Sequence, residues 1–304
     1  MSKKNSNLTA AKDAKNDEFY TRLEDIENEL RHYKEHFNDK VVLCPCDESE
    51  HTNFYKHFML NFMEYGLKKL VCIGYRTNRP AEIHVVERTA DGYIETNKHL
   101  IGNGDFRNVE TQQFFDDSDI IVTNPPFSLF REFVDLLMKK DKKFLIIGNK
   151  NAITYKEIFP LIKEDKIWMG YTSPSKFTQL DKDELKNMTG LTRWFTNLDI
   201  KKRNIILDTG IEYEYGMKQG WYQKYDNYDA ININKVNQIP MDYTDTMGVP
   251  ITFLDKFNPN QFEILGITSS SRELAGEWLT TEKGSTRASL NGKYMYGRIL
   301  IKKK

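Results

Sequence analysis

The stretch IIVTNPPFSLF, Ile120–Phe130, decides the fold, because an apolar run meets two prolines within it. Ile120–Thr123 has the β-branched composition of a buried strand. Proline lacks an N–H and has a fixed φ, so a strand or helix that enters Pro125-Pro126 ends there. A helical pattern resumes at Leu129. The sequence therefore predicts a strand, a rigid turn that presents acceptor oxygens to a ligand, and a helix.

Strands and helices alternate around this turn. Short apolar runs predict buried strands at Lys40–Cys46, Lys69–Tyr75, Asp119–Thr123 and Lys143–Gly148. Apolar residues at helical spacing predict helices at Leu23–Phe37, Asn53–Tyr65 and Leu129–Lys139. Alternation around Asp91-Gly92 predicts a hairpin over Ile83–Glu95. This order is typical of an α/β fold with a mostly parallel sheet and helices on both faces, in which ligands bind at the carboxyl ends of the strands.

After Trp168 the pattern becomes shorter and more β-like. Strands are predicted at Thr192–Leu198 and Arg203–Asp208, and Tyr213–Tyr228 is rich in tyrosine and glycine. We place a domain boundary near Glu212. The chain is thus predicted to comprise a disordered tail over residues 1–16, a larger domain over 17–212 and a smaller C-terminal region over 213–304.

The composition is that of an ordinary soluble protein, with 29% charged and 39% hydrophobic residues among 304. The sequence contains no apolar run long enough to span a bilayer, and residues 1–17 lack the apolar segment of a signal peptide, so we expect a cytoplasmic location without a membrane partner. The cysteines Cys44, Cys46 and Cys72 have no partner pair at zinc spacing. We therefore expect small core residues and no metal site.

The formal net charge is zero, but the charge is unevenly distributed. Residues 266–304 carry eight basic and three acidic residues, an excess of five positive charges. Such a basic tail is either a solvated end or a phosphate-binding face. Its basic residues are Arg272, Lys283, Arg287, Lys293, Arg298, Lys302, Lys303 and Lys304.

The turn after Thr123 has the chemistry to hold an adenine base. The N6 lone pair of adenine is delocalised into the ring, which makes this nitrogen a poor nucleophile. The side-chain oxygen of Asn124 and the carbonyl of Pro125 could accept both N6 hydrogens and aim the lone pair. Phe127 could stack on the base, which would have to flip out of a duplex to reach the turn. A plain proline-rich connection between strand and helix is the alternative.

The tetrapeptide Asn124-Pro125-Pro126-Phe127 after a strand resembles the catalytic motif of S-adenosylmethionine-dependent amino-methyltransferases. Three further stretches make the sequence similar to the EcoRI-type adenine methyltransferase family: DEFYTRLEDIENEL from Asp17, VVLCPCDESEHTNFYKHF from Val41 and GNGDFRN from Gly102. The resemblance covers most of the chain. It implies a Rossmann-like methyltransferase fold, with a catalytic, S-adenosylmethionine-binding domain over 17–212 and a target-recognition region over 213–304.

The resemblance also implies the roles of individual residues. The catalytic residues would be Asn124, Pro125, Pro126 and Phe127. The cofactor pocket would contain Phe19, Tyr20, Thr21, Asp47, Asn53, Phe54, Asp105 and Phe106. The flipped base would stack on Phe127 and, on its other face, on Phe195 or Trp194.

Each of these roles has a structural alternative. Asn53 and Phe54 could be a helix cap and a core aromatic, and Asp105 could be a turn residue. Trp194 and Phe195 could be core residues. One departure from the wider superfamily is that no glycine follows the first strand before Gly66, where a glycine-rich cofactor loop is usual.

The expected function is site-specific methylation of adenine N6 in double-stranded DNA, within restriction-modification, by direct transfer from S-adenosylmethionine. The basic tail and Tyr213–Tyr228 are expected to contact the DNA, and a monomer is expected because one methyl group is added to one strand at a time. Two alternatives remain open. One is an amino-methyltransferase that acts on RNA or on protein glutamine, and the other is a catalytically inactive DNA-binding module with an altered cofactor loop.

Overall fold

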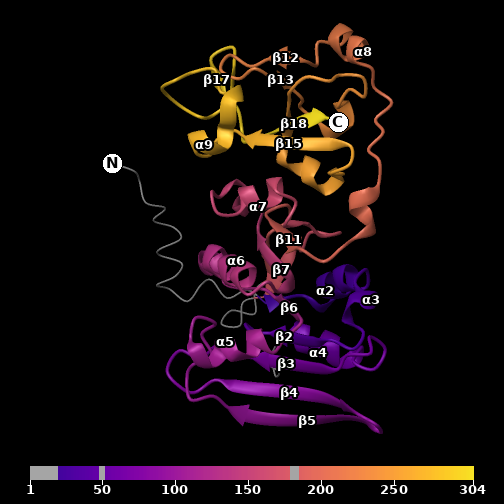
Figure 1. Ribbon diagram of the computed structural model, residues 1–304, viewed down its shortest axis with the longest axis vertical. Coiled ribbons are helices and arrows are strands. Elements are labelled where there is room, and N and C mark those ends of the chain that lie inside the picture. The colour runs from indigo at the N-terminus through magenta and orange to yellow at the C-terminus, as the bar shows by residue number, and fades with distance from the viewer. Residues whose placement is uncertain (1–19, 48–51, 179–184) are drawn as a thin grey trace. The chain divides into compact units, whose positions relative to one another are not determined.

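The computed structural model describes residues 20–47, 52–178 and 185–304, which belong to two compact units (Figure 1). The first unit comprises residues up to 150 together with 169–198, and the second comprises 151–168 together with 199–304. The compact units thus change at Asp199, whereas Glu212, where we placed the boundary, lies inside the second unit. The functional division into a catalytic and a recognition region remains a prediction.

The first unit is built on an eight-stranded sheet that is parallel at its centre. The strand order is β5-β4-β3-β2-β6-β7-β11-β8. The strands are β2 Val41–Cys44, β3 Lys69–Ile73, β4 Glu82–Thr89, β5 Gly92–His99, β6 Ile120–Thr123, β7 Lys143–Asn149, β8 Trp168–Met169 and β11 Thr192–Thr196. The four strands β3, β2, β6 and β7 run parallel, whereas β4, β5 and β11 are antiparallel to their neighbours. The predicted mixed α/β fold and the predicted β4–β5 hairpin are confirmed.

The central strands are buried on both faces. Every residue of β6 is buried, as are Val42–Cys44 of β2 and Phe144–Gly148 of β7. Continuous apolar burial of this kind is the pattern of parallel strands that are covered on both sides. Cys44 and Cys72 face each other in the β2–β3 register and are buried, and Cys46 is half-buried. Burial raises the pKa of the Cys44 thiol, as expected for a core cysteine.

The helices of the first unit include three predicted regions, of which Asn53–Tyr65 ends earlier, at Leu60, and one helix that was not predicted, α5. They are α2 Leu23–Leu30, α3 Lys34–Phe37, α4 Asn53–Leu60, α5 Val109–Asp116 and α6 Phe130–Lys139. The single helix predicted over Leu23–Phe37 is wrong, because the chain tightens between α2 and α3. There His32 and Tyr33 donate their backbone N–H groups three residues back, and Tyr33 turns its ring into the core.

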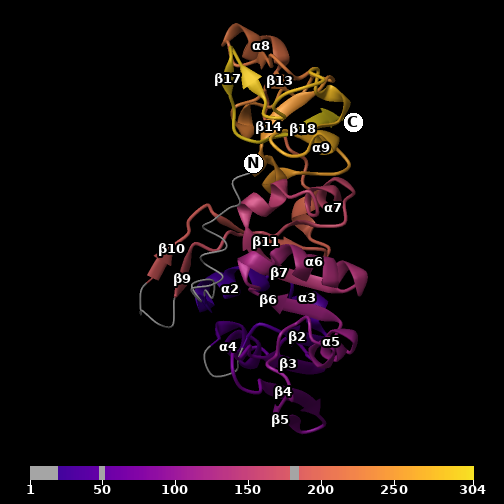
Figure 2. The same ribbon diagram turned by 90° about the vertical axis from the view of Figure 1, so that its left-hand side faces the viewer.

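A separate three-stranded sheet joins the N-terminal segment to residues after β8. Its strands are β1 Tyr20–Thr21, β9 Lys176–Thr178 and β10 Leu185–Asn187, in the order β1-β9-β10 and all antiparallel. Figure 2 shows β9 and β10 side by side. The N-terminal segment, which we predicted to lie in the cofactor pocket, thus pairs with residues 177–178, far along the chain.

The second unit contains a five-stranded sheet in the order β12-β13-β14-β18-β15. Its elements are α7 Phe159–Lys163, α8 Tyr213–Lys218, β12 Gln223–Lys224, β13 Ile231–Asn232, β14 Met247–Pro250, β15 Phe262–Ile267, α9 Arg272–Ala275, β16 Ser289–Leu290, β17 Lys293–Tyr294 and β18 Arg298–Lys303. The strands β16 and β17 form a separate hairpin. The apolar residues of β18 and β15 form the centre of this unit.

The strand predicted at Arg203–Asp208 is wrong. Residues 201–204 form a 3-10 helix, and the segment after it is extended but joins no sheet. Two side chains from a later loop take the place of a partner strand: Gln261 bonds both the N–H and the C=O of Leu207, and Asn258 donates to the carbonyl of Ile205. The backbone is satisfied in this way, and Ile205 and Ile206 remain exposed.

The buried carboxylate of Glu29 in α2 forms hydrogen bonds with Tyr171 and Thr172, which follow β8. Its Oε1 accepts hydrogen bonds from the Tyr33 hydroxyl at 2.8 Å and the Tyr171 N–H at 2.7 Å. Its Oε2 accepts from the N–H and the hydroxyl of Thr172, at 2.6 and 2.7 Å. Burial raises the pKa of Glu29, and the four donors act in the opposite direction. The carboxylate therefore ties α2 to the chain that leads into β9.

Replacing Glu29 with glutamine is expected to destabilise the protein. An amide places N–H atoms against donors that need an acceptor, so Glu29→Gln should lower the free energy of unfolding by about 1–3 kcal/mol in urea denaturation at pH 7. Glu24→Gln, an exposed change in the same helix, is the control and should shift it by less than about 0.5 kcal/mol. Equal effects of the two variants would contradict this role of Glu29.

Candidate active site

The turn Asn124–Phe127 lies at the carboxyl end of β6, in the parallel centre of the first sheet. Pro126 has an extended backbone, with φ −53° and ψ 127°, and the 3-10 helix Phe127–Leu129 follows at once. The N–H of Leu129 donates to the carbonyl of Pro126 at 2.9 Å. Pro125 is buried, whereas Asn124 and Phe127 are half-buried. The end of β6 thus fixes the backbone before Asn124, and the prolines and the start of α6 fix the backbone after it.

Asp47 joins the carboxyl ends of three neighbouring parallel strands. Its Oδ2 accepts a 2.6 Å hydrogen bond from the Thr123 hydroxyl at the end of β6, and its N–H donates to the carbonyl of Ile73 at the end of β3. Asp47 itself follows β2 and is buried. We predicted Asp47 in the cofactor pocket. Its side chain bonds Thr123, the residue that directly precedes Asn124.

Asp105 lies over the end of β3 because Gly104 permits a very close approach. Gly104 has φ +79°, and a Cβ there would lie 2.8 Å from the Cβ of Ala81 and 3.0 Å from the carbonyl oxygen of Gly74. Only glycine adopts this conformation without strain in so little space. The N–H of Arg76 donates to the carbonyl of Asn103 at 2.9 Å. Asp105 is therefore held at the same edge of the sheet as Asp47.

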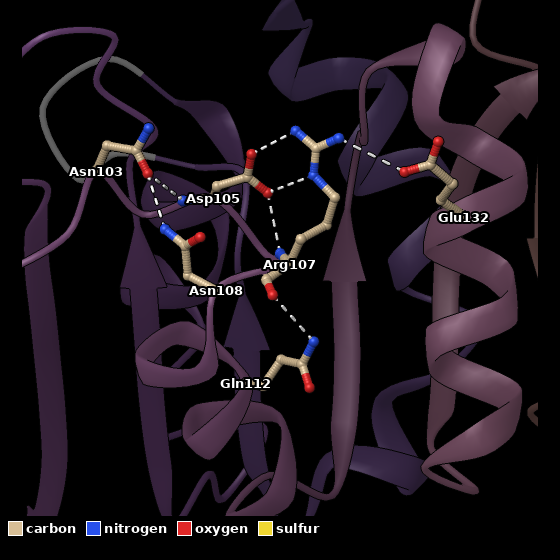
Figure 3. Close-up of polar contacts among 6 residues, drawn as sticks. All are labelled: Asn103, Asp105, Arg107, Asn108, Gln112 and Glu132. Atoms are coloured by element: carbon tan, nitrogen blue, oxygen red, sulfur yellow. Dashed lines mark hydrogen bonds and ion pairs between the residues drawn. The ribbon is translucent and has the colours of Figure 1, made fainter.

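Arg107 binds the carboxylate of Asp105 with a forked contact (Figure 3). Its Nε donates to Oδ1 at 2.9 Å and its Nη2 to Oδ2 at 2.5 Å, and its backbone N–H also donates to Oδ1. The bonds from Arg107 hold the pKa of Asp105 below its usual range. The Nη1 of Arg107 lies 3.6 Å from Glu132 in α6, the helix that follows the turn. Arg107 therefore links Asp105 to the helix behind Asn124.

The same close-up shows how the segment before α5 is ordered. Asn103 Oδ1 accepts bonds from the N–H of Asp105 and the side-chain amide of Asn108, and Gln112 donates to the carbonyl of Arg107 (Figure 3). Phe106 is buried and packs edge to face on Phe133, with 5.0 Å between the ring centroids. Phe106 is thus a core residue whose burial orients its neighbour Asp105.

The predicted N-terminal cofactor segment is tied to the start of α4. Asn53 donates its side-chain amide to the carbonyl of Thr21 at 2.8 Å, and it is the first residue of α4, whose N-cap position is Thr52. Tyr20 is half-buried and Thr21 is buried. Phe54 is buried against Trp194, with the rings edge to face at 6.0 Å. Phe19 lies outside the described residues. The structure thus brings Thr21 and Asn53 together and gives Phe54 a core position.

Trp194 and Phe195 lie in β11, a fully buried strand. The exposed fractions of their side chains are 0% and 1%. Trp194 packs on Phe54, and Phe195 packs on Phe130 with 5.0 Å between the rings. Each ring face is therefore covered by other core side chains. This packing favours the core role over base stacking.

Two features expected to contact DNA are partly internal. In Tyr213–Tyr228, Tyr222, Tyr225 and Tyr228 are buried, so these rings build the core of the second unit. In the basic tail, Arg298 is buried and its Nε donates to Asn232, and Lys303 donates to the carbonyl of Met241. These five residues make polar contacts within the second unit, and their expected contact with DNA stays a prediction.

Sequence reasoning did not identify Thr123 or Arg107. A basic residue two positions after an aspartate in a turn can fold back onto the carboxylate, so the sequence did contain a signal for Arg107. The positive φ of Gly104 specifies the conformation of this turn.

Within residues 20–47, 52–178 and 185–304, no group of three or more His, Cys, Asp or Glu side chains is arranged to hold a metal ion. The described helices are all too short or too polar to cross a membrane.

The ion pair predicts a pH-dependent effect of Arg107→Ala. Because Arg107 lowers the folded-state pKa of Asp105, the pair contributes stability above the unfolded pKa of about 4 and loses it as the pH falls through the folded value. Arg107→Ala should therefore lower the free energy of unfolding at pH 7, by less than about 1 kcal/mol for so exposed a pair, and the difference from wild type should shrink toward pH 3. Urea unfolding between pH 3 and pH 7 measures the free energy of unfolding of both proteins. Lys139→Ala, which removes an exposed ion pair with Asp135, is the control. A difference that grows toward acid pH would contradict the assignment.

Comparison with known proteins identifies the family. The family described as adenine-specific methyltransferase EcoRI matches residues 7–304. The chain is 44% identical to the Type II methyltransferase M.EcoRI of Escherichia coli, over 99% of this chain and 97% of that protein. It is 36% identical to the Type II methyltransferases M.MgeORF184P of Mycoplasma genitalium, over 96% and 97%, and M.MpnI of Mycoplasma pneumoniae, over 97% and 97%. No solved structure matches the chain. The protein therefore belongs to the EcoRI family of adenine-specific methyltransferases.

Proposed function

We propose that this enzyme methylates adenine N6 at a specific site in double-stranded DNA, using S-adenosylmethionine and a Rossmann-like catalytic domain. The observation that carries the proposal is the position of Asn124-Pro125-Pro126-Phe127 at the carboxyl end of a central parallel strand, beside Asp47 and the Asp105 segment. Ligands of open α/β sheets bind at this edge. The family description and the Type II relatives supply the adenine and restriction-modification parts of the proposal.

The residues at the sheet edge fit the proposed cofactor chemically. S-adenosylmethionine presents a cationic amino group, ribose hydroxyls and an adenine amino group, and when bound it supplies an electrophilic methyl group on a sulfonium. The carboxylates of Asp47 and Asp105 are acceptors suited to such donors. Arg107 holds the pKa of Asp105 low and occupies both lone pairs of Oδ1 but only one of Oδ2, so Oδ2 can accept a further hydrogen bond. We assign the cofactor pocket to Asp47, Asn53, Asp105 and the segment Tyr20–Thr21.

Asn124 and Pro125 would position and polarise the target nitrogen. The side-chain oxygen of Asn124 and the carbonyl of Pro125 accept the two N6 hydrogens, which shifts electron density toward N6 and aims its lone pair. The fixed φ of proline holds one acceptor, and α6 holds the backbone that follows. Positioning and pre-oriented acceptors suffice, since direct transfer needs no covalent intermediate.

Phe127 is the aromatic side chain proposed to stack on the flipped base, because it closes the same four-residue turn as Asn124 and is only half-buried. In this proposal Trp194 and Phe195 remain core residues. The second unit would carry target recognition, and the enzyme would act as a monomer in the cytoplasm, where a methyltransferase of a restriction-modification pair meets its DNA.

The proposal predicts that Asn124→Ala abolishes methyl transfer without abolishing cofactor binding. Removal of one pre-oriented acceptor should lower the rate by about 10²–10³-fold or more. The measurement is transfer of labelled methyl from S-adenosylmethionine to unmethylated genomic DNA, with nucleoside analysis for 6-methyladenine and calorimetry for cofactor binding. Asn97→Ala, an exposed change in β5, is the matched control and should remain active.

The outcomes separate the alternatives. Label in RNA or protein glutamine, and none in DNA, would replace the DNA assignment by another amino-methyltransferase. A folded wild type that does not bind S-adenosylmethionine would indicate an inactive DNA-binding module. Full activity of Asn124→Ala would disprove the role of the turn.

A further inference from the structure

The β16–β17 hairpin, which we define as residues 285–296, presents a basic and aromatic outer surface in the second unit. Tyr294 and Tyr296 are 58% and 86% exposed, which is unusual for large aromatic side chains. Lys293 and Arg287 are also exposed. The Arg287 guanidinium lies 5.1 Å from the centroid of the Tyr294 ring. Tyr294 and Tyr296 thus share one face of the hairpin with Arg287, whereas Lys293 stands opposite Leu290 in the register and lies on the other face, next to the tip.

The inner surface of the hairpin is anchored on a core. Ala288 is fully buried, and Leu290 and Met295 pack against the cluster that contains Tyr225 and Tyr228. The N–H of Met295 donates to the carbonyl of Ala288 at 2.8 Å. The inner side chains thus fix the hairpin, and its exposed basic and tyrosine side chains lie outside this core.

Asp226 fixes the tip of the hairpin. Its two carboxylate oxygens accept the N–H groups of Asn291 and Gly292, at 3.0 and 2.9 Å. Both tip residues have positive φ, 49° and 75°, as a tight Asn-Gly hairpin turn requires. The negative charge of Asp226 is thus engaged by two backbone donors at the turn, and its own N–H donates to the carbonyl of Ser289.

Asn227 and Tyr228 fix the first strand of the hairpin and the residues that lead into it. The Asn227 side chain donates to the carbonyl of Arg287 and accepts from the N–H of Ser289, both at 2.9 Å. The Tyr228 hydroxyl donates to the carbonyl of Thr286 at 2.6 Å. Three consecutive residues therefore bond the hairpin along its length. A surface that is ordered before binding loses less conformational entropy when a partner binds.

These features match what duplex DNA needs from a protein. The major groove is wide enough for a two-stranded β-ribbon, and Arg, Lys and Tyr side chains bind phosphate oxygens or base edges. We propose that the β16–β17 hairpin is a DNA-binding element of this enzyme, with Arg287 and Lys293 on phosphates and with Tyr294 and Tyr296 at a groove. The inference rests on the proposed DNA substrate. It assigns DNA binding to one hairpin within the basic tail, and not to all of its basic residues.

The test compares two double variants with wild type. Arg287→Ala/Lys293→Ala removes the charges, and Tyr294→Ala/Tyr296→Ala removes the exposed rings. Fluorescence anisotropy at several salt concentrations measures binding to a duplex that carries the methylation site identified from the product of the wild-type enzyme. Calorimetry with S-adenosylmethionine and circular dichroism verify cofactor binding and folding. Tyr93→Ala/Lys98→Ala, on the exposed strand β5, is the matched control.

The charge variant removes two proposed phosphate contacts. The magnitude of the slope of log affinity against log salt concentration should therefore fall by about 0.9 for each contact. The tyrosine variant should lower kcat/KM for DNA by about tenfold or more, because it loses one or two contacts to base edges. Its affinity for S-adenosylmethionine should not change. The control should resemble wild type. Wild-type affinity, salt slope and kcat/KM in both hairpin variants would overturn the inference. Wild-type enzyme that methylates no DNA would instead overturn the proposed function.

Discussion

The candidate active site depends on one hydrogen bond, from the Thr123 hydroxyl to the carboxylate of Asp47. Parallel strands bring their carboxyl ends to one edge, but they do not by themselves set the spacing of the loops that leave it. Asp47 sets that spacing, because its side chain reaches the end of β6 and its N–H reaches the end of β3. A buried carboxylate is costly unless it is well bonded, so its presence here favours one arrangement of the three strand ends.

A second constraint adds the Asp105 segment to the same edge. Gly104 lets the backbone lie against β3, and the forked contact of Arg107 fixes the carboxylate that this backbone presents. Arg107 also approaches Glu132 in α6. Arg107 therefore lies between Asp105 and α6. The same helix follows the turn that ends in Phe127. Charged side chains at the sheet edge thus connect the Asp105 segment to α6, although each pair alone contributes little stability.

The sequence predicted the parts of the fold that depend on local patterns. The apolar strand before Asn124 and the rigid Pro125-Pro126 turn could be recognised because proline chemistry and short apolar runs act within a few residues. Arg203–Asp208 has the same apolar appearance, yet Gln261 and Asn258 bond its backbone from elsewhere in the chain. The burial of Trp194 likewise depends on the position of β11 within the sheet, which no local pattern contains.

The C-terminal charges show why composition alone misplaces a binding surface. Counting basic residues treats Arg298 and Lys293 alike, but Arg298 donates to Asn232 inside the second unit, whereas Lys293 is exposed on the β16–β17 hairpin. The bonds from Asp226 and its two neighbours order a hairpin whose outer side chains make no contribution to the core. Exposed aromatic rings are informative about binding, and an ordered backbone loses less conformational entropy when a partner binds. That combination, rather than the number of positive charges, distinguishes this hairpin from the rest of the basic tail.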